Sequence, residues 1–265
     1  MTLNWLNKYG LLIFDHIDST NLEAHRLLKH GINKNLVILA GSQKEGRGRY
    51  GRYWHSPKGN LYLSLLLKHN TAISSLSQYT FVASLSMANA IFELLGKDID
   101  LKLKWPNDIL LTDKKISGIL LESISNIQYN VASWLIIGIG VNLKLCPQGL
   151  QYSVTSLEAE GYKDIIPELL LDRFMQHFSV NCNLLQKKGF MDLKNRWLKH
   201  AWCLGEMFSC CIKGKQISGI FSGVGENGDF LLKSKDGTVN RINSGEVFKE
   251  PLQNDFFNKK LSVQI

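Results

Sequence analysis

The sequence predicts an α+β protein: a mixed β-sheet covered by helices, followed by a small β-barrel or β-meander. Apolar segments of strand length are interspersed with longer helix-like segments through residues 1–202, which is typical of a mixed sheet with helical layers. Near Ala201 the pattern changes to short strands separated by the turn signals KGK, ENGD and KDG. The 265 residues, 45% of them apolar, suffice for one domain over residues 1–202 and a smaller one over residues 203–265.

The first predicted elements are a helix and two strands. Asp18 and Ser19 are candidate N-caps of a helix that ends near Gly31, with leucines at roughly helical spacing and basic residues near its end. The apolar runs NLVILAG and LYLSLLL then predict two strands. The segment GRGRYGRYWHSPKGN, residues 46–60, therefore joins two strands.

A long helix and three further strands follow. Residues 76–95 contain no proline and precede Gly96, which favours a helix packed on the sheet. LKLKW predicts a strand, ILLTDKKISGILLES a hairpin that turns at residues 112–114, and ASWLIIGIGVNL a central strand. Residues 167–185 and 190–200 predict two more helices.

Charge and cysteine content limit the classes of protein. A net charge of +8 and a pI near 9.2 favour contact with polyanions or anionic small molecules, although enzymes with neither role are also moderately basic. The five cysteines form no CxxC pair, which argues against a disulfide framework and favours a reducing compartment. The sequence has no signal-peptide pattern and no apolar run of about eighteen residues. We therefore expect a cytoplasmic protein without a membrane span.

The segment of residues 46–60 has the composition of an anion-binding loop. Glycines let the backbone approach a ligand closely, and three arginines and Lys58 supply positive charge. A solvated surface loop is the alternative interpretation. The G-x-G-x-x-G spacing does not indicate a dinucleotide-binding turn, because the next regular element is a strand and not a helix. Trp54 fits either a core position or stacking on a nucleobase.

The segment KWPNDILLTDKKISGILLES carries a second group of candidates. Pro106 favours an extended residue before it, so Asn107 and Asp108 are expected at a bend after a strand, as site residues or as turn formers. Lys115 is either a point charge for phosphate or an ordinary turn lysine. Gly118 interrupts an apolar strand, which indicates a bulge, a close ligand or a weak point in the strand.

Two other chemistries receive little support. The seven histidines and five cysteines show no metal-binding spacing, so a zinc site is not expected. Ser19 and Thr20 have no histidine paired with them by motif, so helix capping explains them better than nucleophilic catalysis does.

Five ordered segments together closely resemble the biotin protein ligase family: DSTN, GRGRYGRYWHSPKGNLYLSL, KWPNDILL, KKISGILLES and IGIGVNL. The resemblance covers nearly the whole chain. It implies a catalytic domain like that of class II aminoacyl-tRNA synthetases, a C-terminal SH3-like domain, and a form without the family's N-terminal DNA-binding domain. DNA binding is therefore not expected, and homodimer formation is left open.

The resemblance also implies a reaction and the residues for it. Biotin and MgATP would give biotinyl-5′-AMP and pyrophosphate, and a lysine of a biotin carrier domain, in acetyl-CoA carboxylase or a related carboxylase, would then accept the biotin. The implied catalytic residues are Lys115, Arg47 and Arg49. The implied biotin contacts are Ser19, Thr20, Asn21, Gln43, Arg47 and Gly118. The implied ATP or adenylate contacts are Arg49, Arg52, Trp54, Asn107, Lys115 and Asn142, with Asp108 for magnesium.

Two alternatives stay open. A lipoate ligase or octanoyl transferase has a similar fold and related carrier domains, but these enzymes lack the GRGRxGRxW loop as a set. A nucleic-acid-binding protein is favoured by the basic pI and the arginine-aromatic loop, although no helix-turn-helix, RRM or KH signature is present.

Overall fold

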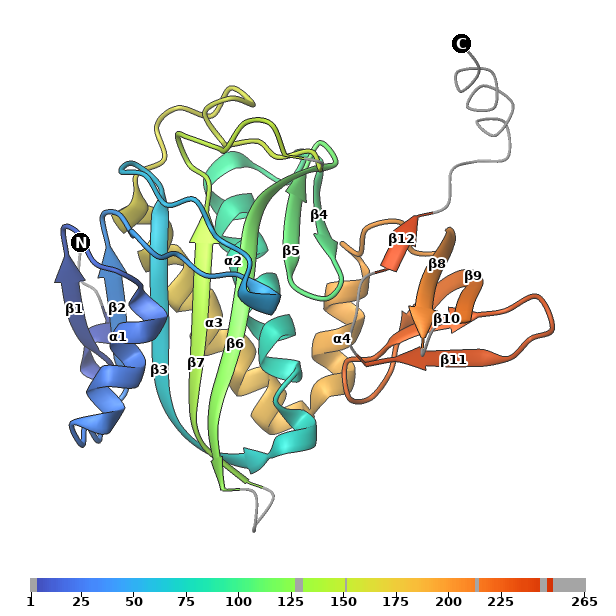
Figure 1. The fold of residues 1–265 in the computed structure, drawn as a ribbon, viewed down its shortest axis with the longest axis horizontal. Helices are drawn as coiled ribbons and strands as arrows, with labels where there is room; N and C mark the ends of the chain where they lie inside the picture. The colour runs from blue at the N-terminus through green and yellow to red at the C-terminus, as the bar shows by residue number, and fades with distance from the viewer. Residues whose placement is uncertain (1–3, 127–130, 151, 213–214, 244–246, 250–265) are drawn as a thin grey trace. The chain divides into compact units, whose positions relative to one another are not determined.

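The computed structural model describes residues 4–126, 131–150, 152–212, 215–243 and 247–249 (Figure 1). The described chain divides into two compact units, with the boundary between Trp202 and Cys203. The first unit contains a seven-stranded mixed sheet with helices, and the second a five-stranded antiparallel sheet. The predicted fold class is confirmed.

The large sheet has the strand order β1-β2-β3-β7-β6-β5-β4. Only the β1 and β2 pair is parallel, with α1 as the crossover between them. Sequence reasoning missed β1, an edge strand whose Ile13 is 65% exposed. The strands are β1 (Gly10–Phe14), β2 (Leu36–Ala40), β3 (Leu61–Ala72), β4 (Leu101–Lys104), β5 (Asp108–Leu111), β6 (Lys114–Asn126) and β7 (Val131–Val141).

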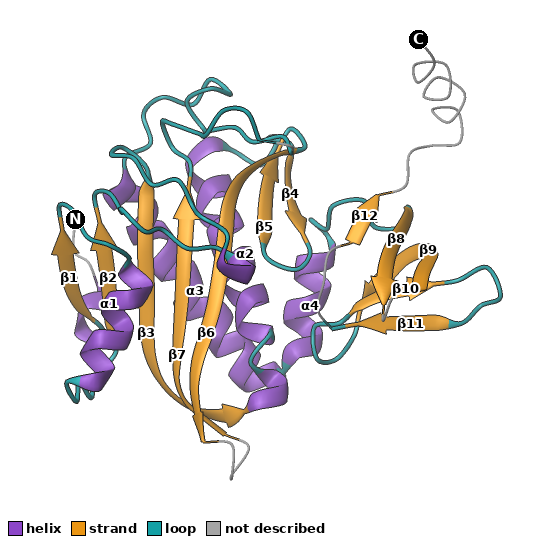
Figure 2. Cartoon of the chain, in the orientation of Figure 1, coloured by secondary structure: helices purple, strands orange, loops and turns teal. Residues whose placement is uncertain are grey.

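The helices lie on opposite faces of this sheet (Figures 1 and 2). Helix α1 covers one face, and α2 and α3 cover the other. Ala24 on α1 is fully buried, and its small side chain lets the helix pack against Ile38 and Leu66. The helices are α1 (Thr20–Lys29), α2 (Gln78–Leu95), α3 (Pro167–Lys188) and α4 (Phe190–Leu198), each close to its predicted range.

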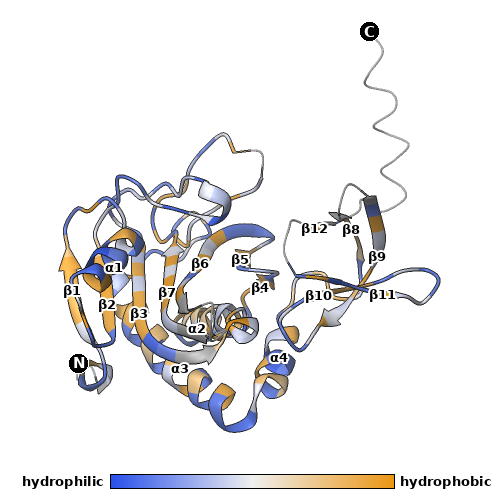
Figure 3. Cartoon of the chain, turned by 60° about the horizontal axis from the view of Figure 1, so that its bottom comes forward, coloured by the Kyte–Doolittle hydropathy of each residue, from blue (hydrophilic) through white to orange (hydrophobic). Residues whose placement is uncertain are grey.

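The main core lies along the central strands, where Figure 3 shows stretches of hydrophobic residues. Every residue of β2 is buried, and α1 packs on one of its faces through Ala24. A strand in this position has a continuous apolar run and not an alternating pattern. This explains why NLVILAG was recognisable as a strand in the sequence.

One detail of the first helix differs from the prediction. Ser19 is the N-cap residue of α1 and has an extended backbone, but its side chain makes no capping hydrogen bond. Instead, Oδ1 of Asp18 accepts a hydrogen bond from the Ser19 amide at 2.6 Å, and both carboxylate oxygens of Asp18 accept from Arg26. The start of α1 is therefore organised by Asp18 and leaves the Ser19 hydroxyl available for another partner.

The second unit is built around three phenylalanines. Phe221 and Phe230 are stacked with ring centroids 4.1 Å apart, and Phe208 contacts both edge to face. The predicted KGK turn and the tail from residue 254 include residues outside the described part. The strands, in the order β11-β10-β9-β8-β12, are β8 (Met207–Ile212), β9 (Lys215–Val224), β10 (Phe230–Lys233), β11 (Val239–Ile242) and β12 (Val247–Lys249).

None of the helices in the described ranges combines the length and the apolarity that a bilayer crossing requires.

Candidate active site

Three glycines on β6 and β7 leave a strip of backbone without side chains on the face of the sheet that carries α1. Gly118 pairs with Gly140 across the two strands. A Cβ atom on Gly140 would overlap the Trp54 indole, and one on Gly138 would overlap the Asn21 carboxamide. The indole and the carboxamide therefore lie directly on the strands, in a position that only glycine permits. This strip is called the glycine floor below.

Residues 46–60 form a short hairpin over this floor. Arg47 pairs with Tyr53, the Gly48 amide donates to the Arg52 carbonyl at 2.7 Å, and the Trp54 amide donates to the Gly46 carbonyl at 2.9 Å. A Cβ atom on Gly46 would overlap the carbonyl oxygen of Trp54. The glycines thus allow a tight hairpin that holds Trp54 on the glycine floor.

A lysine and an aspartate meet beside Trp54. Lys115 Nζ lies 2.6 Å from Asp108 Oδ1, 5.3 Å from the Trp54 ring centroid and 5.9 Å from that of Tyr152. The side chains of Lys115 and Asp108 are 17% and 21% exposed. Lys115 is the second residue of β6 and not a turn residue. An anion on the glycine floor would meet a positive charge that is only partly hydrated, where electrostatic attraction is stronger than in water.

The three arginines of the hairpin are placed differently. Arg49 Nη1 donates to Asn107 Oδ1 at 3.2 Å, and Asn107 Nδ2 donates to the Ile119 carbonyl at 2.8 Å, next to Gly118. Arg47 and Arg52 are exposed. The structure therefore brings Arg49 and Asn107 together beside the glycine floor and places Arg47 and Arg52 at the surface of the hairpin.

Neutral polar groups form a second cluster near the same floor. Gln43 Oε1 accepts hydrogen bonds from the amide of Thr20 and from Thr20 Oγ1, at 2.9 and 3.1 Å. Gln43 Nε2 donates to Ser56 Oγ at 3.0 Å, and Ser56 Oγ donates to the Trp54 carbonyl at 2.9 Å. This chain of bonds connects the start of α1 with the residue that carries the indole.

The polar cluster continues through residues that sequence reasoning missed. Ser64 Oγ is 2.7 Å from Thr20 Oγ1 and 2.5 Å from Asn21 Oδ1, and Asn21 Nδ2 donates to Glu122 Oε2 at 2.7 Å. A serine that interrupts LYLSLLL and a glutamate that ends ILLE were the available signals. We call the side chains of Thr20, Asn21, Gln43, Ser56, Ser64 and Glu122 the polar network.

Five buried side-chain atoms have no hydrogen-bond partner among the described residues, and they include one atom of Asn142 and one of Trp54. Asn142 donates through Nδ2 to the Thr155 carbonyl at 3.0 Å, but its Oδ1 has no hydrogen bond to any described residue. The same holds for Nε1 of Trp54. Buried polar atoms are ordinarily paired, so an acceptor and a donor of this kind indicate a place where a ligand or water supplies the partner.

Glu160 stabilises the segment of residues 153–155, which forms hydrogen bonds with Lys115 and Asn142. Its carboxylate accepts hydrogen bonds from Thr155 at 2.7 Å, Thr112 at 2.8 Å and Lys114 at 2.9 Å. The hydrogen bond from Thr155, followed by that from Lys114, holds the pKa of Glu160 below its usual value. Since Lys115 pairs with this segment through its backbone, Glu160 helps to fix the edge of the site.

Replacing Glu160 with glutamine is expected to lower the free energy of unfolding by about 1 kcal/mol at neutral pH. A carboxylate with a depressed folded-state pKa stabilises the protein fully above its ordinary pKa of 4.5, and this contribution is lost as the pH falls through the folded-state value. Urea unfolding of wild type and variant at a series of pH values measures the difference. The difference should be constant above about pH 5.5 and shrink in more acidic buffer. A difference independent of pH would contradict this role.

Magnesium would find few protein ligands here. The described residues contain no group of three or more histidine, cysteine or acidic side chains arranged for a metal. Mg²⁺ that accompanies a nucleotide is usually held by one or two carboxylates together with substrate phosphates and water. Asp108, beside Lys115, fits as a single carboxylate ligand of that kind.

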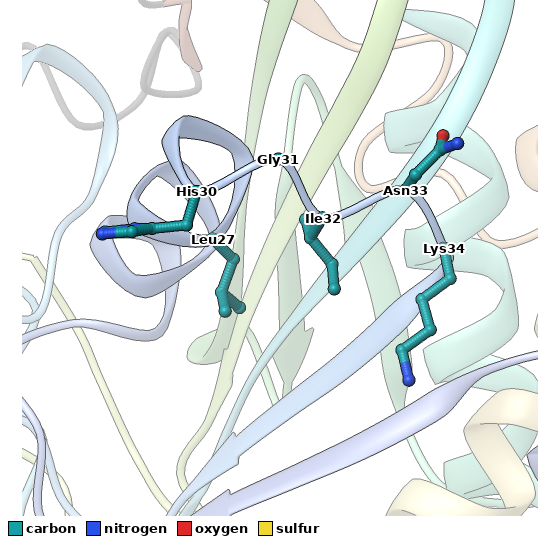
Figure 4. Close-up of a pocket in the computed structure, with 6 residues that line it drawn as sticks. All are labelled: Leu27, His30, Gly31, Ile32, Asn33 and Lys34. Atoms are coloured by element: carbon teal, nitrogen blue, oxygen red, sulfur yellow. The ribbon is translucent and has the colours of Figure 1, made fainter.

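A surface hollow lies at the other end of α1, away from the polar network (Figure 4). It is lined by Leu27, His30, Gly31, Ile32, Asn33 and Lys34, and shares no residue with the groups described above. Figure 4 shows the His30 and Lys34 side chains pointing apart, so these polar groups do not converge on a ligand. We therefore place the candidate site on the glycine floor.

Comparison with known proteins gives one consistent family. Residues 13–142 match the biotin/lipoate A/B protein ligase family. A biotin–acetyl-CoA-carboxylase ligase of Paracoccus denitrificans is 35% identical over 236 residues, which is 87% of this chain and 97% of that protein. The bifunctional ligase/repressor BirA of Bacillus subtilis is 29% identical over 89% of this chain and 73% of its own length.

A solved structure has the same fold. The biotin protein ligase from Aquifex aeolicus in complex with biotin and ATP superimposes with a TM-score of 0.77 at 29% identity. The match covers 91% of this chain and 99% of the Aquifex chain.

Proposed function

The chain belongs to the biotin/lipoate A/B protein ligase family, and from this premise we propose that it is a biotin protein ligase. It joins biotin and ATP as biotinyl-5′-AMP and then transfers biotin to a lysine of a biotin carrier domain. The observation that carries the proposal is the glycine floor, with the polar network at one end and the Lys115 and Arg49 cations at the other. Such a site fits a molecule with a neutral polar ring and a carboxylate.

The end with the polar network is proposed to hold the ureido ring of biotin. A cyclic urea has two N–H donors and one carbonyl acceptor, so its site needs both kinds of partner. Ser19, Thr20, Asn21 and Gln43 supply them, with the backbone of Gly118 beside the ring. Arg47, on the hairpin above, is proposed to reach the biotin carboxylate when the hairpin closes.

The charged end is proposed to hold ATP. Trp54 stacks on adenine, and the unpaired Oδ1 of Asn142 accepts from the adenine amino group. Asn107 and Arg52 would contact the nucleotide from the two sides of the hairpin tip. Mg²⁺, held by Asp108 and the phosphates, would neutralise part of the charge of the triphosphate.

The chemistry requires two anions to meet. A carboxylate oxygen of biotin attacks the α-phosphorus of ATP, and the bond from that phosphorus to the pyrophosphate oxygen breaks. Lys115 and Arg49 offset the repulsion between the reactants and the charge that develops on the phosphate oxygens. The carrier lysine, as the free amine, then attacks the biotinyl carbonyl, and AMP leaves as the amine gives up a proton.

The proposed partner is the carrier domain of acetyl-CoA carboxylase or a related carboxylase. The proposed compartment is the cytoplasm, in agreement with the free thiols of Cys146, Cys182 and Cys203.

Replacing Arg49 with glycine is expected to raise the release of free biotinyl-5′-AMP about tenfold, the size expected for the loss of one hydrogen bond from a charged donor. The bond from Arg49 to Asn107 ties the hairpin tip to the sheet, so its loss should open the hairpin over the bound intermediate. Rapid filtration after a single turnover, in the absence of a carrier domain, measures the release rate. Lys58→Gly removes an exposed charge from the same hairpin and serves as the control. An unchanged release rate in the Arg49 variant would show that the tether does not retain the intermediate.

The nearest rival function, lipoate or octanoyl transfer, predicts a different ligand preference. Isothermal titration with biotin and with lipoate decides between them, because lipoate lacks the ureido N–H groups that could donate to the oxygen acceptors of the polar network. Saturable binding of biotin with no heat from lipoate is the expected result. Preference for lipoate would refute the proposal.

A further inference from the structure

Glu122 lies at the end of the polar network and binds a residue of the proposed biotin site. Its Oε2 accepts a hydrogen bond from Asn21 Nδ2 at 2.7 Å, and His25 Nε2 lies 3.4 Å from the same oxygen. An ionised carboxylate accepts hydrogen bonds and has none to donate. Asn21 must therefore turn its amide nitrogen toward Glu122.

This constraint determines where the other end of the Asn21 carboxamide points. With Nδ2 bound to Glu122, Oδ1 faces Ser64, whose hydroxyl lies 2.5 Å away. Ser64 is fully buried, and the Asn21 side chain lies on Gly138 with no room to shift toward the strand. The carboxamide is thus confined between a carboxylate, a hydroxyl and the glycine floor.

The same constraint extends through the hydroxyl groups. Thr20 Oγ1 donates its proton to Gln43 Oε1, because that oxygen can only accept. Ser64 Oγ, which neighbours both Thr20 Oγ1 and Asn21 Oδ1, then donates its one proton to either oxygen. All protons of these hydroxyls point within the network, so toward a ligand Thr20 Oγ1 and Asn21 Oδ1 can act only as acceptors. Two acceptors of this kind match the N–H groups of a cyclic urea.

We propose that Glu122 is a positioning residue that fixes the orientation of the Asn21 carboxamide and so sets the acceptor pattern that recognises the N–H donors of biotin. This inference rests on the proposed function, because it names the residue that prepares the biotin end of the site. Glu122 touches Asn21 and no reacting atom, so it affects capture of biotin and not the chemical step.

An exchange of the two side-chain chemistries tests the proposal. In Glu122→Gln the new amide can donate, so Asn21 is free to turn its oxygen away from the ligand. In Asn21→Asp two carboxylates face each other at the position of the present 2.7 Å hydrogen bond. The double variant Asn21→Asp/Glu122→Gln keeps the net charge and restores a donor opposite an acceptor, with an oxygen of residue 21 again toward Ser64.

Biotin-dependent pyrophosphate release gives the readout. Each single variant is expected to raise the KM for biotin about tenfold or more, while kcat and the KM for ATP change by less than about twofold. The double variant should return the KM for biotin to within about threefold of wild type. Glu158→Gln, the same substitution at an exposed glutamate outside the network, is the control and should match wild type.

Three results would overturn the positioning role: an unchanged KM for biotin in Glu122→Gln, a loss in kcat instead of KM, or a double variant no better than the poorer single variant. If the single variants acted only by disturbing the fold, their effects on the KM for biotin would add in the double variant. A return of the KM toward the wild-type value therefore excludes a folding defect as the cause. Absence of biotin-dependent pyrophosphate release in the wild type would refute the proposed function itself, which keeps the two failures distinct.

Discussion

Replacing Lys115 with alanine is expected to slow formation of biotinyl-5′-AMP by about 10²–10³-fold, with a much smaller change in the affinity for biotin. The ammonium group lies beside Asp108 and over the Trp54 ring in a largely buried position, where a positive charge stabilises a developing phosphate charge far more than it does in water. Single-turnover pyrophosphate release and an equilibrium titration with biotin measure the two quantities separately. A larger loss in biotin affinity than in rate would make Lys115 a binding residue only.

Asp108 provides the control for this experiment. Removing Lys115 leaves the Asp108 carboxylate without its ion-pair partner in a mostly buried position, which by itself disturbs the site. The double variant Lys115→Ala/Asp108→Asn removes that unpaired charge. If the double variant recovers most of the rate, the lost activity came from the stranded carboxylate and not from the missing ammonium group. We expect the rate to stay well below that of Asp108→Asn alone, which removes the proposed magnesium ligand but keeps the ammonium group of Lys115.

Replacing Gly140 with alanine is expected to reduce kcat/KM for adenylate formation by about 10²-fold, the cost of displacing a substrate-positioning group by roughly 1 Å. The added methyl group would overlap the Trp54 indole, which lies directly on the backbone of β7. Trp54 must then leave the glycine floor, and the stacking surface proposed for adenine moves with it. Steady-state kinetics with varied ATP measure the effect, and circular dichroism verifies that the variant is folded.

A double-mutant cycle tests whether Gly140 acts through Trp54. If the methyl group harms activity only by displacing the indole, Gly140→Ala should cost little in a background where Trp54 is already alanine. The coupling between the two positions should then be nearly as large as the effect of Gly140→Ala alone. Additive losses would mean that the methyl group blocks the substrate directly.

Much of the fold could be predicted because its signals are local. The hairpin of β5 and β6 follows from turn residues between two apolar runs, and β2 from an uninterrupted run of residues buried on both faces. Sequence reasoning missed β1, which has the same length as β2 but contains no buried residue. Its place depends on parallel pairing with β2 across helix α1, which is a contact between distant parts of the chain.

In the candidate site, too, some residues are recognisable from local sequence and others only from contacts between distant parts of the chain. Lys115, Trp54 and Gly118 were candidates from the composition of single segments, and their roles stay predictions that rest on the family resemblance. The importance of Gly138 and Gly140 depends on which side chains lie on them, and Asn21 and Trp54 come from other parts of the chain. Glu122 meets Asn21 across 101 residues of sequence, so no local pattern could pair them.

The most direct test of the central claim is the intact mass of a purified biotin carrier domain after incubation with this protein, biotin and MgATP. The glycine floor and its two chemically different ends predict that the carrier domain gains one biotinyl group on a single lysine, and only when both biotin and ATP are present. A carrier domain of unchanged mass, with active protein verified by biotin binding, would contradict the account.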